Sequence, residues 1–400
     1  MAGRLGGCRQ WPVEGDKYEW RKLIHSGRES AIAAILGVSF QLNQVWNETR
    51  TELIMAKVVK LHGDEFQLPT ADNTTEGLKI FRAANERFRQ IPWPTPFDET
   101  MHRVELSDAR NLSWLEDRSV HLVVTSPPYW TLKQYEGSRG QLGDLQDYGE
   151  FLGELDKVWR ECARVLVPGG RIICVVGDVC VPRKRGGRHY VMPLHADIQV
   201  RARSLGLDVL TPILWHKIAN GVTESEGNGA GFYGKPYQPG AVVKNDLEYI
   251  LFLRKGGEYR KVEPLQKALS MLTKPEMQAW WRSIWTDIRG ASTRTGHPAP
   301  YPPVLAERLI RMFSFAGDIV LDPFGGTGST AVAAIASGRH SVSVDIEPKY
   351  VAMARENIEK AIANPRNTGA ISASLIDGSF DRLDRGRSAV QTVGGVSRPF

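Results

Sequence analysis

Val320-Leu321-Asp322-Pro323-Phe324-Gly325-Gly326-Thr327-Gly328-Ser329-Thr330 is the stretch that decides the fold of this 400-residue chain. An apolar run ends at Asp322, a glycine-rich turn follows, and small residues from Thr330 to Ala336 predict a helix. Glycines at such a turn remove the Cβ atoms that would block a ligand. The next predicted strand, the short segment His340–Val344, ends at Asp345, where a carboxylate could accept the hydroxyl hydrogens of a ribose. Because the turn lacks G-x-G-x-x-G, a nucleoside site without a pyrophosphate is favoured.

A second stretch with chemical content is Thr125-Ser126-Pro127-Pro128-Tyr129-Trp130, at the end of the apolar run Val120–Val124. The Ser126 hydroxyl and the Pro127 carbonyl are two acceptors, and Pro127 and Pro128 fix the backbone that holds them. Two acceptors set against the two N–H bonds of an exocyclic amino group would aim its lone pair at an electrophile. Tyr129 offers an aromatic face on which a flipped base can stack. This stretch therefore predicts a pocket for an amino group of a nucleobase.

Together the two stretches resemble the motifs of the S-adenosylmethionine-dependent amino methyltransferases of DNA. The catalytic motif precedes the cofactor motif, which matches the circularly permuted β class of that family, and the resemblance covers roughly residues 100–363. It implies an α/β fold with a doubly wound, mainly parallel, Rossmann-like sheet and methyl transfer to a flipped base in double-stranded DNA. It also implies the cofactor S-adenosylmethionine and a set of cofactor contacts: the methionine part on Asp322, Pro323, Gly325, Gly326 and Gly328, the border of the cofactor on Phe324, and the ribose on Asp345.

Two further cofactor contacts follow from the resemblance, each with a structural alternative. Asp108 lies where the family often has an acidic residue near the adenine, but it could be an ordinary N-cap. His297 lies in Thr295–Pro302, a segment similar to the one that completes the cofactor pocket of the family, but it could be a packing residue at the start of a helix.

The first position of the catalytic motif bears on the choice of base. In the family, Ser there accompanies mostly N4-cytosine methylation, whereas Asp or Asn accompanies mostly N6-adenine methylation. Ser126 therefore favours cytosine, with N6-adenine methylation and a non-catalytic DNA-binding relic of the fold as alternatives. The neighbouring segments also look like the N4-cytosine branch: Gln141–Asp144, Val165–Gly170, Leu214–Lys217 and Asn245–Leu251. Trp215 could wall the base pocket or pack at a strand end.

Basic residues predict where DNA is held. The net charge of +6 is compatible with a polyanionic partner. A basic loop expected at the active edge predicts phosphate contacts at Arg183, Lys184, Arg185 and Arg188, with an ordinary solvated loop as the alternative. The β class places its target-recognition region between the two halves, which corresponds to residues 255–292. A homodimer and a companion restriction endonuclease are further partners that the sequence leaves open.

The pattern of elements predicts five segments: a helical N-terminal extension (1–96), a catalytic half (97–254), a target-recognition region (255–292), a cofactor half (293–364) and a mobile tail (365–400), mobile at least beyond Asp377. Within the extension, the spacing of Leu53, Ile54, Val58 and Leu61 predicts one helix and Leu78–Phe88 another. Three prolines between positions 92 and 96 end the extension.

Composition is ordinary for a globular protein, with 42% hydrophobic and 24% charged residues. The sequence has no apolar run of membrane-spanning length and no secretory signal, so we expect a cytoplasmic, nucleoid-associated protein without a membrane partner. Its four cysteines form no C-x-x-C pair, so we expect reduced packing residues and no metal site.

Overall fold

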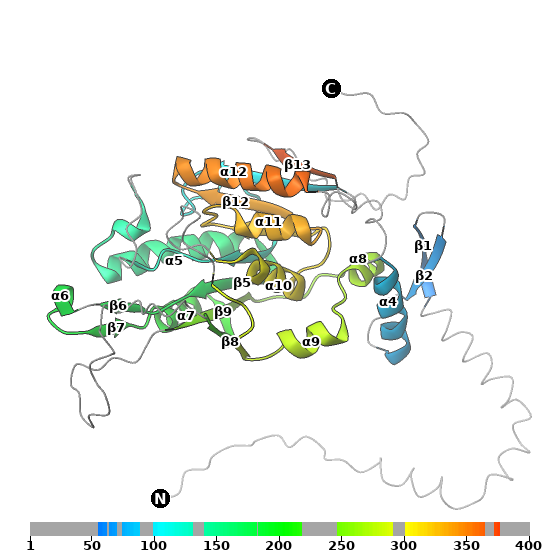
Figure 1. Ribbon diagram of the computed structural model, residues 1–400, viewed down its shortest axis with the longest axis horizontal. Coiled ribbons are helices and arrows are strands. Elements are labelled where there is room, and N and C mark those ends of the chain that lie inside the picture. The colour runs from blue at the N-terminus through cyan, green and yellow to red at the C-terminus, as the bar shows by residue number, and fades with distance from the viewer. Residues whose placement is uncertain are drawn as a thin grey trace, which may run out of the picture. The chain divides into compact units, whose positions relative to one another are not determined.

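The computed structural model describes residues 55–61, 64–69, 74–88, 99–130, 140–181, 183–217, 246–290, 301–364 and 372–376 (Figure 1). By its contacts the chain divides into Met1–Ala56 and Lys57–Phe400. Apart from the first residues of one strand, every described element belongs to the second unit.

A nine-stranded sheet forms the centre of that unit, in the order β10-β8-β9-β5-β4-β11-β12-β3-β13. Only β9 runs antiparallel to its neighbours among these strands; every other pair is parallel. The predicted mainly parallel, doubly wound sheet is therefore confirmed. The strands are β3 (Glu99–Leu106), β4 (Val120–Thr125), β5 (Leu166–Val176), β8 (Leu207–His216), β9 (Leu247–Lys255), β10 (Ile284–Trp285), β11 (Ile319–Asp322), β12 (His340–Asp345) and β13 (Ser372–Ile376).

Helices cover both faces of the sheet because successive strand residues point to opposite sides. In β4, Val123 packs in the cluster that contains α5 (Tyr148–Val165) and α7 (Leu194–Ser204). Its neighbours Leu122 and Val124 pack in the cluster that contains the helix α10 (Pro303–Phe313). On that second side, α11 (Ser329–Ala336) lies between α10 and α12 (Pro348–Ala363) (Figure 1). The core is thus a sheet between two helical layers.

Helix α5 shows how the sequence sets these layers. Apolar residues recur at i, i+3, i+4 and i+7, so one stripe of the helix is apolar. Phe151, Leu155 and Trp159 on this stripe are buried against the sheet. The side chain of Asp147 caps the helix by accepting from the backbone N–H of Glu150 at 2.7 Å.

The N-terminal extension differs from the prediction. Residues 1–54 lie outside the described part. The helix predicted around Leu53–Leu61 is wrong: Met55–Leu61 is strand β1, paired with β2 (Asp64–Pro69). The second predicted helix is confirmed as α4 (Thr75–Phe88), whose Phe81 and Ala84 pack against Leu265 and Leu269 of α8 (Pro264–Leu269).

Two other segments also differ. Ser372–Ile376 falls in the predicted mobile tail, yet it forms β13 and pairs with β3 as an edge strand of the sheet. The basic loop is a hairpin of β6 (Val179–Val181) and β7 (Tyr190–Met192) that carries the short helix α6 (Arg183–Gly186) at its tip. The region 255–292 contains α8, a second short helix α9 (Lys274–Trp280) and β10.

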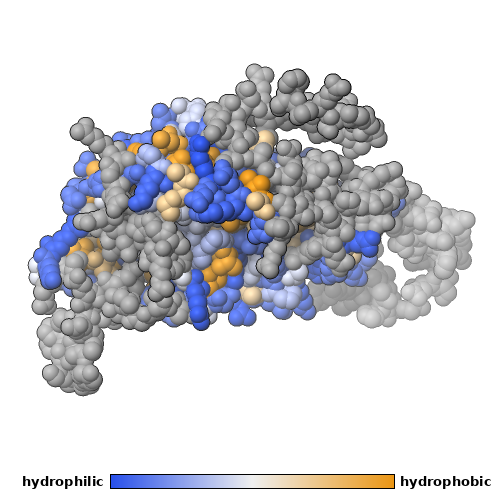
Figure 2. All heavy atoms as spheres, turned by 45° about the horizontal axis from the view of Figure 1, so that its top comes forward, coloured by the Kyte–Doolittle hydropathy of each residue, from blue (hydrophilic) through white to orange (hydrophobic). Residues whose placement is uncertain are grey.

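The surface is mixed in polarity. Hydrophobic residues lie in separate patches among hydrophilic ones on the face shown in Figure 2. No helix in the described part of the chain is long and apolar enough to cross a membrane.

Cys162 and Cys174 are buried in the core, where burial raises the pKa of both thiols. Both therefore behave as packing residues.

Candidate active site

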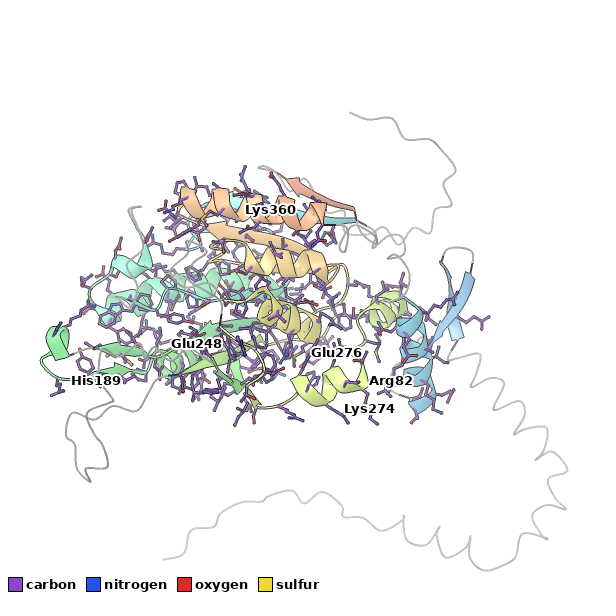
Figure 3. The ribbon with its side chains drawn as sticks, viewed as in Figure 1. Arg82, His189, Glu248, Lys274, Glu276 and Lys360 are labelled. Carbon is purple, nitrogen blue, oxygen red and sulfur yellow. The ribbon has the colours of Figure 1, made fainter. Side chains whose placement is uncertain are left out.

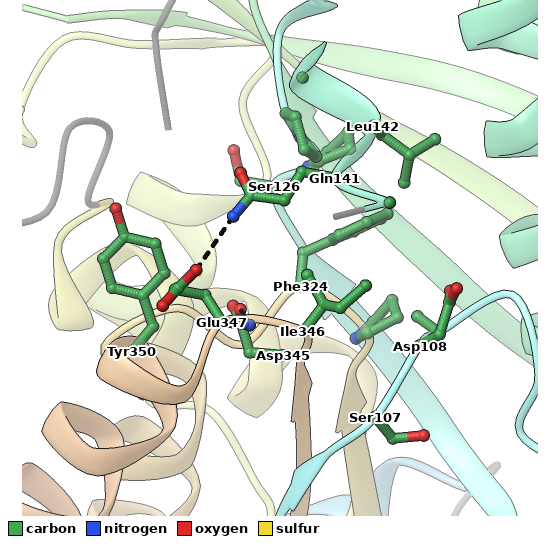
Figure 4. Close-up of a pocket in the computed structure, with 16 residues that line it drawn as sticks. Ser107, Asp108, Ser126, Gln141, Leu142, Phe324, Asp345, Ile346, Glu347 and Tyr350 are labelled. Atoms are coloured by element: carbon green, nitrogen blue, oxygen red, sulfur yellow. Dashed lines mark hydrogen bonds between the residues drawn. The ribbon is translucent and has the colours of Figure 1, made fainter. Parts of the chain in front are cut away.

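One pocket at the carboxyl edge of the parallel strands brings the two sequence stretches together (Figure 4). Its empty volume is about 740 Å³, which includes space open to solvent. The catalytic stretch contributes Ser126, Pro127 and Pro128, and the cofactor stretch contributes Pro323 and Phe324. The rest of the lining is Ser107, Asp108, Ala109, Gly140, Gln141, Leu142, Gly143, Asp345, Ile346, Glu347 and Tyr350.

Strand pairing explains why the stretches meet. β4 and β11 are parallel neighbours, with Leu122 opposite Val320 and Val123 opposite Leu321. Each stretch begins where its strand ends, and parallel neighbours end at the same edge. β12 pairs with β11 on the other side and brings Asp345 to the same edge. Segments far apart in the sequence therefore share one rim.

Asp322 fixes the joint between these strands and does not line the pocket. Its carboxylate accepts hydrogen bonds from Thr125 Oγ1 at 2.7 Å, Thr330 Oγ1 at 2.5 Å and Tyr301 Oη at 3.3 Å. The backbone N–H of Phe324 donates to it at 3.1 Å. The side chain is 1% exposed, and burial raises its pKa to about 6 in spite of these bonds. Asp322 therefore ties the end of β4 to the glycine turn.

The glycine turn is as tight as the sequence predicts. Gly326 and Gly328 have φ of 49° and 84°, in the left-handed region that favours glycine. A Cβ on Gly325 would lie 3.0 Å from Ser343 Cβ, so only glycine fits there without a shift. None of these three glycines is among the lining residues, and they set the path of the backbone that follows Pro323 and Phe324.

Asp345 lies on the pocket wall at the end of β12 (Figure 4). Its two carboxylate oxygens accept from the backbone N–H groups of Gly326, at 2.8 Å, and Glu347, at 2.9 Å. Burial raises its pKa, and those two bonds oppose the rise. The Nε2 of Gln141 donates to Glu347 Oε2 at 3.2 Å beside it. A ribose at this wall would meet two carboxylates.

Asp108 also lines the pocket, held by Arg110. The Arg110 guanidinium donates to both oxygens of Asp108, at 2.6 to 2.9 Å, and to Glu154 at 2.7 Å. The Arg110 backbone N–H adds a bond of 2.9 Å. Burial acts to raise the pKa of Asp108, but the bonds from Arg110 outweigh it and lower the pKa. The carboxylate is therefore charged at neutral pH.

In the catalytic stretch, the Ser126 hydroxyl donates to Tyr129 Oη at 3.3 Å, and Tyr129 Oη donates to the Val175 carbonyl at 3.5 Å. Because its proton is directed to Tyr129, the Ser126 oxygen has lone pairs available to accept a hydrogen bond. Tyr129 is 8% exposed and lies outside the pocket lining. Trp130 after it has φ of 44°, a strained conformation of the kind that clusters at functional sites.

The basic hairpin follows the carboxyl end of β5 and therefore lies at the edge that carries Ser126. Lys184, Arg185 and Arg188 are exposed on it. Arg185 donates to Gln146 Oε1 at 2.8 Å, and its guanidinium lies 5.4 Å from the Trp130 ring centroid. The backbone of Arg183 lies in α6, but its side chain is outside the described part, as is the whole of His297.

Sequence reasoning missed Glu347 and Tyr350 and gave Gln141 no role. A signal for the first two existed. Glu347 caps α12 two residues after Asp345, and Tyr350 follows in the first turn, so both face the ligand edge. Trp215 is 1% exposed and donates its indole N–H to the Ile288 carbonyl at 2.9 Å, which is the packing alternative.

Comparison with known proteins agrees with this geometry. Residues 120–356 match the family model N6_N4_Mtase, described as DNA methylase. The Type II methyltransferase M.MthZI of Methanothermobacter thermautotrophicus is 34% identical over 66% of this chain and 78% of its own length. M.MjaI of Methanocaldococcus jannaschii, also a Type II methyltransferase, is 37% identical over 65% of this chain and 91% of its own length.

A solved structure shares the fold. A protein of Thermus thermophilus, described as a putative DNA modification methylase and crystallised with S-adenosyl-L-methionine, is 47% identical and has a TM-score of 0.54. The match covers 69% of this chain and 100% of that protein. The match to the family model over residues 120–356, together with relatives such as M.MjaI, shows that the chain belongs to the N6/N4 family of DNA methylases.

Proposed function

We propose that this protein transfers a methyl group from S-adenosylmethionine to the N4 amino group of a flipped cytosine in double-stranded DNA. The observation that carries the proposal is that Ser126 and Asp345 open onto one pocket. Had they faced separate surfaces, an amino-group site and a nucleoside site could not cooperate.

The pocket fits S-adenosylmethionine by its chemistry. Carboxylates of Asp345 and Glu347 match ribose hydroxyls, and apolar Phe324, Ile346 and Leu142 match the faces of an adenine. Asp108 is a charged acceptor for the adenine amino group. The Thermus relative, at 47% identity, was crystallised with this compound. When bound, S-adenosylmethionine supplies an electrophilic methyl on a sulfonium. Asp322 and the glycines shape the turn that holds its methionine part.

Ser126 and Pro127 prepare the nucleophile. The Ser126 oxygen and the Pro127 carbonyl accept hydrogen bonds from the two N–H groups of the amino group. This arrangement turns the nitrogen lone pair toward the methyl carbon. A bond forms between nitrogen and that carbon as the carbon–sulfur bond breaks. The nitrogen, now cationic, loses a proton to water. Catalysis is then positioning and electrostatics, with Tyr129 orienting the Ser126 hydroxyl.

The base is cytosine on the strength of Ser126 in the first motif position. N6-adenine methylation is the second candidate, because the matched family spans both kinds of amino group. Phosphate contacts fall to Arg183, Lys184, Arg185 and Arg188 at the hairpin, beside the catalytic stretch. Because the relatives are Type II methyltransferases, a restriction–modification pair is the expected setting.

The test is base-resolved sequencing of DNA from cells that express the protein. We expect N4-methylcytosine in one sequence context. The Ser126→Ala variant should bind S-adenosylmethionine normally by calorimetry yet lose about a hundredfold or more of the methylation rate, as when one transition-state contact is removed. N6-methyladenine in place of N4-methylcytosine would select the second candidate, and no modified base in any context would refute both.

A further inference from the structure

An ion pair between Lys217 and Glu248 lies beside the catalytic stretch, outside the pocket lining described above. Lys217 Nζ is 2.7 Å from Glu248 Oε1, and Glu248 is only 8% exposed. Lys217 directly follows β8, and its backbone N–H donates to the Asp246 carbonyl at 3.0 Å, just before β9. The end of β8 and the start of β9 lie at the edge where β4 and β5 end, so the ion pair shares that edge with Ser126.

Gly177 connects the ion pair to the catalytic stretch. A Cβ on Gly177 would lie 3.4 Å from Tyr129 Cε2 and 3.5 Å from Glu248 Cγ. The Tyr129 ring and the Glu248 side chain therefore converge on one glycine, and the hydroxyl of that ring receives the bond from Ser126. Gly177 is thus the residue that lies between Glu248 and the Tyr129 ring of the catalytic stretch.

The position of the lysine is also fixed. A Cβ on Gly290 would approach Lys217 Cγ to 2.9 Å, so the aliphatic stem lies directly on this glycine. The segment that carries Gly290 is itself anchored by the bond from Trp215 to the Ile288 carbonyl. The stem of Lys217 is therefore packed on this segment, and its ammonium pairs with Glu248.

Stability alone gives little reason to keep such a pair. Desolvation of two charges offsets much of their attraction. A protein with apolar side chains of similar size in place of a buried ion pair is often equally stable. Recognition gives a reason. With its amino group on Ser126 and Pro127, cytosine still presents N3 and O2, both acceptors, and an ammonium offers only donors. Adenine in the same orientation presents one ring acceptor, N1, followed by a C–H.

We propose that Lys217, oriented by Glu248, donates to the ring acceptors of the target cytosine and so selects cytosine over adenine. The inference rests on the proposed function of the same site. Glu248 is a positioning residue, because it acts through the lysine. Lys217 exchanges part of its present hydrogen bonding for the base when the base enters.

The experiment measures single-turnover methylation of a duplex that carries the sequence context found by sequencing. One duplex has cytosine at the target. The other has the 2-aminopyridine C-nucleoside, which keeps the amino group and the adjacent ring nitrogen but lacks the 2-oxo group. The wild type is compared with Lys217→Met and with Lys360→Met, a matched control on α12 whose lysine pairs with Glu356 at an exposed surface (Figure 3). Calorimetry with S-adenosylmethionine checks that each variant is folded.

We expect Lys217→Met to lose about tenfold to a hundredfold on cytosine, the range for a lost charged hydrogen bond, and to lose much less on the analogue. Lys360→Met should match the wild type on both. Equal losses of Lys217→Met on both duplexes, or none on cytosine, would overturn the assignment, whereas a wild type that methylates only adenine would refute the proposed N4-cytosine function on which the assignment rests. A wild type that methylates no base would instead refute the proposed function.

Discussion

Replacing Asp322 by Asn is the sharpest test of how the two halves are joined. The Asp322 carboxylate is fully enclosed and receives the hydroxyls of Thr125, Tyr301 and Thr330. Asn has nearly the same shape, and the hydroxyl rotors can turn to accept from its amide. The variant should therefore fold, and the main loss is the ability to ionise.

The sign of the pH effect follows from burial. Burial raises the pKa of Asp322 from its ordinary 3.8 to about 6, so the folded chain holds this proton more tightly than the unfolded chain does. The stability that the protonated form contributes is complete below the unfolded pKa and is lost as pH rises from there through about 6. The difference between a pKa of 3.8 in the unfolded chain and about 6 in the folded chain corresponds to about 3 kcal/mol in the free energy of unfolding.

Urea unfolding at a series of pH values from 4 to 7.5 measures this contribution. The contributions of all other titratable groups to the free energy of unfolding cancel in the difference between variant and wild type. We expect Asp322→Asn to gain about 2 kcal/mol relative to the wild type across that range, because part of the full contribution of about 3 kcal/mol is already lost at pH 4. Asp287→Asn is a control of opposite sign: bonds from Arg308 lower the pKa of Asp287 below its ordinary 3.8, so its carboxylate stabilises the fold throughout this range and the variant should gain nothing as pH rises. Parallel curves for wild type and Asp322→Asn would refute the reasoning.

Two further predictions test the pocket wall and the glycine turn. Asp345→Asn should weaken S-adenosylmethionine binding about tenfold to a hundredfold by calorimetry, because ribose hydroxyls lose a charged acceptor and the Asn oxygen can accept from only one of the backbone N–H groups of Gly326 and Glu347; unchanged affinity would remove Asp345 from the site. Gly328→Ala should cost about 1–2 kcal/mol in urea unfolding, since its φ is 84° and the new Cβ would lie 3.3 Å from Ala354. Gly153 in helix α5 is the control. A Cβ there would have no other atom within 4 Å, so we expect Gly153→Ala to lose no stability.

The regular elements could be predicted because burial imposes a period on them. The stripe on α5 and the apolar runs of β4 and β11 are set by the core they pack in, so their positions agree with the prediction. The prediction of a helix at Leu53–Leu61 was wrong because a short apolar run fits both the helical period and the strand period. Its pairing with β2 decides the outcome, and that pairing is not a property of the run itself.

The site divides in the same way. Ser126, Phe324 and Asp345 could be found because local sequence determines them: each follows a strand end. Asp322 also lies at a strand end, but its side chain turns inward to Thr125, Tyr301 and Thr330. A motif fixes where a residue stands on the backbone, whereas the direction of its side chain depends on partners from other strands.

The Asp322 contacts bear on the permuted order of the motifs. Pairing of β4 with β11 and the bond from Thr125 to Asp322 join the catalytic and cofactor stretches directly, without use of the chain between them. The geometry of the site therefore depends on which strands are neighbours, and the sequence order of those strands is free to change. Residues 255–292 can occupy the connection for the same reason. They lead from the end of β9 to β10 at the far edge of the sheet, so changes of length there leave the joint between β4 and β11 intact.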